Sequence, residues 1–216
     1  LTTDDWPFLY QKHRQLPVLY VSVLGLLALL SFALIALRFR LQPKQLVSNL
    51  QFLFLGAGFL LLETRAMLAI AVLFGSTWIV NSIVIGIVLF MAFLGNLAVM
   101  KIPSLKEVHG YVGIFAGLAL IYFLPLSLMS GQDYLVKLLL SIVLLGIPML
   151  SAGIVFSRSL ARSEKAEVAL GINIVGAILG ACLEYLSLLV GSNGLVLFAV
   201  LIYALSIVSI KWRKLA

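Results

Sequence analysis

Charge is scarce in this sequence. Charged residues make up 11% of its 216 residues, whereas hydrophobic residues make up 63%, and the mean hydropathy is +1.18. Soluble globular domains are near half apolar and about a quarter charged, so the composition excludes an ordinary soluble domain. The apolar runs also lack the alternation that marks the strands of a membrane barrel. We therefore predict an all-α, polytopic transmembrane helix bundle.

Cysteine and histidine are nearly absent as well. The single cysteine, Cys182, excludes an internal disulfide and is expected to pack as a small apolar residue. His13 and His109 each stand alone in a polar segment, without a second ligand at a metal-binding spacing. The sequence also lacks a phosphate loop, a dinucleotide fingerprint and a Ser/His/Asp set. We therefore expect no catalytic residue, no metal and no cofactor in this chain.

Long apolar runs fill most of the chain, and most approach the roughly 20 residues that a helix needs to cross a bilayer. The expected spans are residues 17–37, 50–74, 78–100, 110–129, 134–156, 168–190 and 195–210. Gly146 and Pro148 are expected to kink the fifth. Residues 1–16 are polar and start at Leu1 without a signal-peptide n-region. We expect this segment to follow an absent soluble domain, and residues 17–216 to form one seven-helix domain.

The net charge of +7 arises from basic residues that gather on one side of the expected bundle. With seven alternating spans, that side holds Arg38, Arg40, Lys44, Lys101, Lys106, Arg158, Arg162, Lys165, Lys211, Arg213 and Lys214. The other side holds only Lys12, Arg14 and Lys137. The positive-inside rule then places the C-terminus in the cytoplasm. Because membrane orientation accounts for the charge, nucleic acid is not an expected partner.

The second expected span carries two charges near its middle, Glu63 and Arg65. Ionisable groups at that depth cost several kcal/mol or more unless they are paired or hydrated. At about 100° per residue the two side chains point roughly 200° apart, so they cannot pair with each other. Gly56 shares the face of Glu63, and Gly58 shares that of Arg65, which predicts close helix packing on two sides. A structural ion pair, a solute or proton site, and snorkelling of Arg65 all remain open.

The sixth expected span places Asn173, Gly176, Gly180 and Glu184 on one face, within about 100° of arc. Glycines four residues apart let membrane helices approach closely. A buried amide and carboxylate on the same face indicate that this face meets protein or water rather than lipid. By contrast, Asn96 beside Gly95 in the third span is interpreted as helix packing.

Depth groups these polar residues together. At about 1.5 Å per residue, Glu184 lies roughly 9 Å inside the outer end of its expected span, and Glu63 and Arg65 lie roughly 16 and 13 Å inside theirs. Asn81 and Lys137 lie within about one turn of the same side. We expect Arg65 to pair with Glu184, with Glu63 near Asn81. The predicted intramembrane polar cluster is Glu63, Arg65, Asn81, Lys137, Asn173 and Glu184.

Three stretches of the sequence carry a resemblance to a known family. They are TDDWPFLY at residues 3–10, GAGFLLLETR at 56–65 with LFGSTWIVNS at 73–82, and GIN at 171–173 with LEYLS at 183–187. Together they resemble the membrane region of bacterial spermidine synthase-like fusion proteins. The resemblance implies a bacterial inner-membrane protein joined to an aminopropyltransferase-like Rossmann domain that uses decarboxylated S-adenosylmethionine. That domain is not in this sequence, so no catalytic residue carries over. Such a domain is expected in the cytoplasm, whereas the charge distribution places Leu1 outside.

The sequence is compatible with three functions. The first is a membrane domain that binds or moves a small, cationic solute, because buried carboxylates suit amines. The second is a non-catalytic anchor or accessory subunit of a larger membrane complex or homo-oligomer, which the small-residue faces favour. The third is a membrane enzyme acting on lipid, for which no nucleophile or metal set is evident. The lipid bilayer is an expected partner in all three.

Overall fold

The structure is a computed structural model that describes residues 6, 16–39, 43–75, 78–124 and 131–215. The polar N-terminal segment, with Lys12, His13 and Arg14, lies outside the described residues apart from Trp6 and Leu16, and so does Arg40. The side chains of Arg38, Lys44, Lys211, Arg213 and Lys214 also lie outside them.

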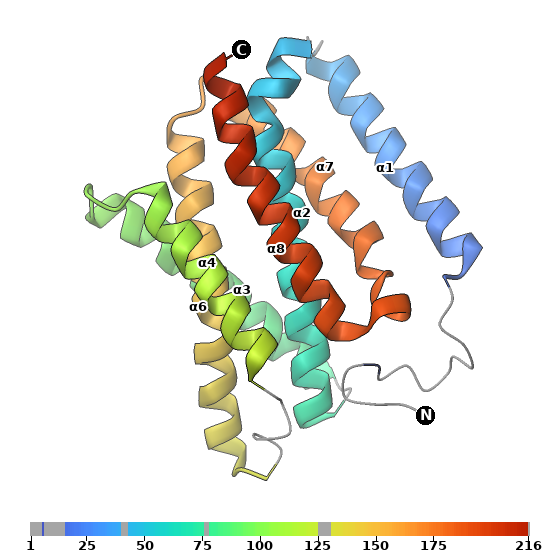
Figure 1. Ribbon diagram of the computed structural model, residues 1–216, viewed down its shortest axis with the longest axis vertical. Coiled ribbons are helices and arrows are strands. Elements are labelled where there is room, and N and C mark those ends of the chain that lie inside the picture. The colour runs from blue at the N-terminus through green and yellow to red at the C-terminus, as the bar shows by residue number, and fades with distance from the viewer. Residues whose placement is uncertain (1–5, 7–15, 40–42, 76–77, 125–130, 216) are drawn as a thin grey trace. The chain divides into compact units, whose positions relative to one another are not determined.

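The described residues form seven α-helices and confirm the predicted all-α bundle (Figure 1). The helices are α1 (Val18–Phe39), α2 (Pro43–Phe74), α3 (Trp78–Lys101), α4 (Glu107–Phe123), α6 (Tyr134–Ala161), α7 (Ala166–Glu184) and α8 (Ser187–Leu215). Six of them are long and apolar enough to cross a membrane, and α4, with 17 residues, is shorter. These six helices indicate a multi-pass membrane protein.

Several helix ends follow from local chemistry. Proline is the first residue of α2, a position at which its missing N–H costs nothing because that donor has no intrahelical acceptor. At the other end of α2, Gly75 adopts a φ of 87° and its N–H donates to the carbonyl of Ala71 at 2.9 Å. Only glycine adopts this left-handed conformation without strain, which explains the break between the second and third spans.

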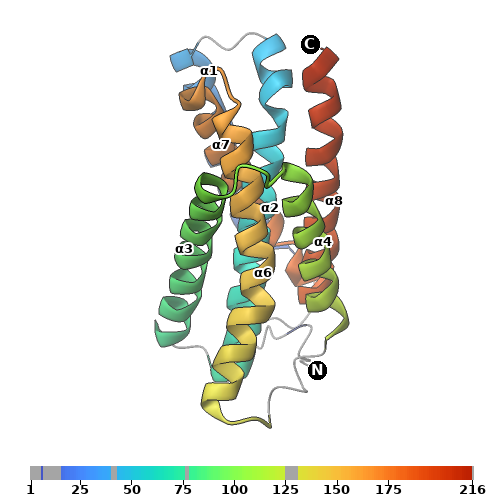
Figure 2. The ribbon, with the colours of Figure 1, turned by 90° about the vertical axis from the view of Figure 1, so that its left-hand side faces the viewer.

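The described helices divide between two compact units. The first contains residues 62–161 together with residues 1–7, and so includes the end of α2 with α3, α4 and α6. In this unit α6 packs against α3 on one side and α4 on the other, as Figure 2 shows. A Cβ added at Gly117 of α4 would meet the ring of Pro148 at 2.7 Å. The proline of α6 is thus covered by a glycine of α4, and α6 continues through it to Ala161.

The second unit contains residues 8–61 and 162–216, and so includes α1, the first part of α2, α7 and α8. Here α7 packs beside α1, where the rings of Tyr20 and Tyr185 stack with centroids 5.5 Å apart. The core of the unit is largely apolar and includes Phe52, Leu55, Ala169, Ile172, Leu195 and Ala199, together with the buried polar residues Gln51, Ser187, Ser192, Ser206 and Ser209. Most of α1 remains exposed to its surroundings, which suits a helix that faces lipid.

Two expected boundaries in the last third of the chain differ from the structure. The sixth helix ends at Glu184 rather than at Val190, and a turn at Tyr185 and Leu186 leads directly into α8. Between the sixth and seventh expected spans, a turn was expected at residues 191–194. The structure shows only a break at Gly191, whose φ is 82°, and the residues on either side of it are helical. The apolar run through Leu188–Val190 hides the earlier helix end, since no glycine or proline marks it.

Candidate functional site

The central charges of α2 have different surroundings. The Arg65 side chain is 4% exposed, whereas Glu63 is half-buried. Both belong to the first unit and lie within the apolar segment Leu46–Phe74. Glu63 is 11 residues before Phe74, or about 16 Å along the helix axis at 1.5 Å per residue. Glu63 is therefore partly exposed near the middle of a membrane-spanning helix, and Arg65 is enclosed by protein.

Two other members of the predicted intramembrane polar cluster lie in the first unit. Asn81 is exposed and lies in the first turn of α3. Lys137 is half-buried, and its backbone N–H donates to the carbonyl of Asp133 at 2.9 Å, so it lies in the first turn of α6. Tyr134 meets Phe74 edge to face, with ring centroids 5.2 Å apart. Lys137 therefore lies about one turn inside the end of the bundle where α2 stops.

The remaining members of the predicted cluster, Asn173 and Glu184, lie on α7 in the second unit. Glu184 is half-buried and is the last residue of α7, so its expected depth of about 9 Å inside the span was wrong for this helix. The pairing of Arg65 with Glu184 would join the two units and stays a prediction. The structure does bring Asn173 to α2, where its side-chain nitrogen donates to the carbonyl of Phe52 at 3.0 Å.

The face of α7 that carries Asn173 packs very closely on α2. A Cβ added at Gly56 would meet the backbone of Asn173 and would lie 2.9 Å from the backbone nitrogen of Ala177. At Gly180 an added Cβ would lie 2.6 Å from the carbonyl oxygen of Ala57. At Gly176 it would meet the backbone of Leu53. This backbone-on-backbone approach is possible only with glycine, and it is the close contact expected of small residues in membrane helices.

On another face, Gly58 of α2 receives an aromatic ring from α8. An added Cβ at Gly58 would lie 2.8 Å from Cε2 and from Cζ of Tyr203. The Tyr203 side chain is 0% exposed, so the ring fills the space that the glycine leaves. The four glycines predicted to pack closely on α2 and α7, namely Gly56, Gly58, Gly176 and Gly180, thus lie at close helix contacts, and α2 is packed on two faces in the second unit.

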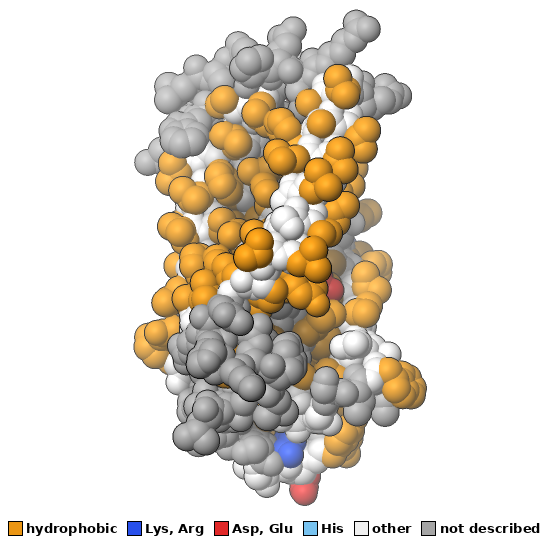
Figure 3. Space-filling model, turned by 90° about the vertical axis from the view of Figure 1, so that its right-hand side faces the viewer, with side chains coloured by type: hydrophobic (Ala, Val, Ile, Leu, Met, Phe, Trp, Pro, Cys, Tyr) orange, Lys and Arg blue, Asp and Glu red, His pale blue; other side chains and the backbone are white. Residues whose placement is uncertain are grey.

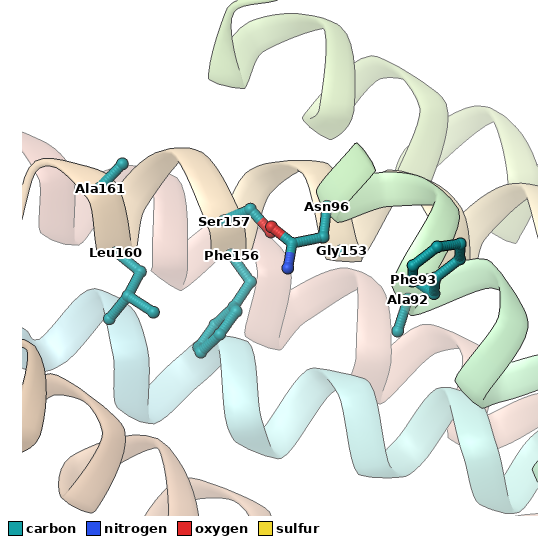
Figure 4. A pocket seen from close by; sticks show the side chains of 8 residues that line it. All are labelled: Ala92, Phe93, Asn96, Gly153, Phe156, Ser157, Leu160 and Ala161. Carbon is teal, nitrogen blue, oxygen red and sulfur yellow. The ribbon is translucent and has the colours of Figure 1, made fainter. Parts of the chain in front are cut away.

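The sequence interpretation missed a groove between α3 and α6 in the first unit. The groove has a volume of about 510 Å³ and is lined by Ala92, Phe93 and Asn96 of α3 and by Gly153, Phe156, Ser157, Leu160 and Ala161 of α6. Figure 4 shows the Asn96 side chain pointing from α3 toward Ser157 of α6. The α6 residues follow the i, i+3, i+4, i+7, i+8 pattern of one helix face. The sequence predicts only a packing role for Asn96, whereas in the structure its side chain also lines this groove.

The groove lies at the basic end of α3 and α6. Arg158 of α6 donates from Nη2 to the carbonyl oxygens of Ile102 and Pro103, each at 2.8 Å. A cation at this position satisfies carbonyls that follow the last turn of α3. Lys101, the last residue of α3, and Lys106 are both exposed. The nearby N-terminus of α4 is capped by His109, whose Nδ1 accepts from the Lys106 N–H at 3.0 Å.

The described residues contain no group of three His, Cys, Asp or Glu side chains placed to hold a metal ion. Cys182 is half-buried on α7. Comparisons with protein-family models, with curated proteins and with solved structures found no match for this chain.

Proposed function

We propose that this chain is the membrane domain of a spermidine synthase-like protein in the bacterial inner membrane, with a cytoplasmic C-terminus. In this proposal the domain binds or moves a small cationic solute, and Glu63 is the carboxylate that meets it. The three sequence stretches that resemble those fusion proteins support the family. The position of Glu63 supports the activity.

One observation carries the solute site: Glu63 is half-buried near the middle of a membrane-spanning helix, whereas Arg65 two residues on is enclosed. A carboxylate at that depth costs several kcal/mol unless water or a cation compensates it. In this proposal the partly exposed Glu63 meets such a cation from outside the protein, and an organic amine supplies the charge. The helical spacing places the enclosed Arg65 on the opposite side of α2, so Arg65 is not expected to pair with Glu63 within the helix.

Cysteine accessibility tests whether water and solute reach this face. Met67 lies four residues after Glu63, on the same side of α2, and is half-buried. In a background with Cys182→Ala, which removes the native thiol, Met67→Cys should react with a water-soluble trimethylammonium methanethiosulfonate reagent. Spermidine should slow that reaction. Ala69→Cys is the matched control, because Ala69 is 2% exposed and should stay unreactive.

The alternative is a non-catalytic anchor or accessory subunit of a larger membrane complex. Besides lipid, the exposed apolar surface of α1 can contact a partner helix, since Val18, Leu29 and Leu37 are each more than two-thirds exposed. Figure 3 shows a face covered largely by hydrophobic side chains over this helix. An unreactive Met67→Cys, together with a second polypeptide that copurifies in fixed stoichiometry, would favour the anchor and reject the solute site.

A further inference from the structure

We propose that the groove between α3 and α6 binds a phospholipid with an anionic head group. The groove is independent of Glu63 and of the proposed solute site. Beside the groove the two helices approach closely: an added Cβ at Gly95 would lie 2.8 Å from the carbonyl oxygen of Leu150, and one at Gly153 would lie 3.4 Å from Cα of Ala92. Small residues at the crossing leave a channel bounded by the larger side chains on either side.

The groove is lined by both apolar and polar side chains. Phe93, which is 60% exposed, lies on one side of the Asn96–Ser157 pair, and Phe156 and Leu160 lie on the other side, toward Ala161 (Figure 4). Asn96 and Ser157 supply an amide and a hydroxyl between these apolar side chains. Ala161, at the end of α6, marks the boundary of the helix. An acyl chain fits the apolar part, and the ester groups of the glycerol fit the amide and hydroxyl, which can donate hydrogen bonds to them.

Charge selects the head group. At this end of the first unit the described residues carry Lys101, Lys106 and Arg158 against one acidic residue, Glu107. Lys101 follows Asn96 by five residues, which is about 7.5 Å along α3 and about 140° around it, so it lies beyond the groove at the end of the helix. Lysine near a membrane boundary attracts anionic lipid. Arg158 is held on the carbonyls of Ile102 and Pro103, so its charge is fixed at this boundary.

Native mass spectrometry of the detergent-solubilised full chain tests the proposal directly. Palmitoyl-oleoyl phosphatidylglycerol and the matching phosphatidylcholine would be titrated separately. We expect one saturable site that prefers phosphatidylglycerol by about fivefold or more, the preference that one nearby lysine provides. Lys101→Gln should reduce that preference, whereas Lys165→Gln, an exposed lysine of the other unit, should not. Equal binding of the two lipids would overturn the anionic head group.

A second set of variants locates the site. Ser157→Phe should fill the groove and remove saturable binding, whereas Val143→Phe should not, because Val143 is 59% exposed on α6 outside the groove. If Ser157→Phe does not fold, Ala161→Phe at the exposed margin serves the same purpose. Undiminished lipid binding in a folded groove-filling variant would overturn the proposal.

A photocrosslinker identifies the occupant in the native membrane. Benzoyl-phenylalanine in place of Leu160, which lines the groove, should capture an adduct with the mass of an anionic phospholipid. Capture of a polypeptide instead would show that the groove holds a partner helix and would overturn the lipid proposal.

Discussion

The side-chain amide of Asn173 on α7 donates a hydrogen bond of 3.0 Å to the backbone carbonyl of Phe52 on α2. Gly56, one turn after Phe52, lies against the backbone of Asn173 itself. The amide and the glycine therefore act at the same point, where two helices touch through their backbones. In a membrane, where apolar side chains gain little by leaving lipid, such contacts and hydrogen bonds hold helices together.

Removing the amide should weaken this contact. Asn173→Ala loses the hydrogen bond to Phe52 without adding bulk, and we expect a loss of about 1 kcal/mol in unfolding free energy, the usual size for such bonds between membrane helices. Asn81→Ala is the control, since Asn81 is exposed. Unfolding in detergent by increasing denaturant measures both. Equal stability of the two variants would contradict the role given to Asn173.

Adding a methyl group at the closest glycine should cost more. At Gly176 an added Cβ would meet the carbonyl of Leu53, a backbone group that cannot move aside. We expect Gly176→Ala to destabilise the protein by about 1–3 kcal/mol, as overpacking does. Gly86→Ala is the matched control, because nothing lies within 4 Å of its added Cβ. The control should be neutral or slightly stabilising through helix propensity.

The contact of Gly58 with Tyr203 should appear as coupling between two substitutions. Gly58→Ala brings a methyl group to within 2.8 Å of the tyrosine ring, so it should be destabilising in the wild-type background. In a Tyr203→Leu background the same change should cost less, by about 1 kcal/mol, because the rigid ring is gone. Additive effects in a double-mutant cycle would show that the ring does not occupy this space.

Arg158 should control the order of the α3–α4 connection. Arg158→Gln loses the two hydrogen bonds to Ile102 and Pro103, and a charged donor contributes about 1.5–3 kcal/mol where it is well placed. We expect faster amide hydrogen exchange over residues 102–106 with little change in α1. Unaltered exchange in this connection would rule out the role of Arg158 as a C-terminal cap of α3.

The helical class and most spans could be predicted because they depend on local composition. Apolar length alone marks a membrane helix, and the spacing of Gly176 and Gly180 alone marks a close contact. The same pattern does not say which helix is touched. That Gly176 meets Leu53 depends on how α7 packs on α2, a contact between residues more than 100 positions apart.

The errors have a similar physical cause. The end of α7 at Glu184 lies within an apolar run and carries no proline or glycine, so hydropathy could not reveal it. The groove beside Asn96 requires α3 and α6 to be neighbours, and residue spacing within one helix carries no such information. Arg65 and Glu184 belong to different units of the chain, so their pairing stays a prediction.

Equilibrium binding of radiolabelled spermidine to the purified full chain tests the central claim most directly. Glu63→Gln keeps the size of the side chain and removes the charge, and Glu107→Gln does the same at the start of α4. The proposed solute site predicts saturable binding in the wild type and in Glu107→Gln, and a loss of at least about tenfold in affinity, or roughly 1.4 kcal/mol, in folded Glu63→Gln. Unchanged binding in Glu63→Gln, or no saturable binding in the wild type, would contradict it.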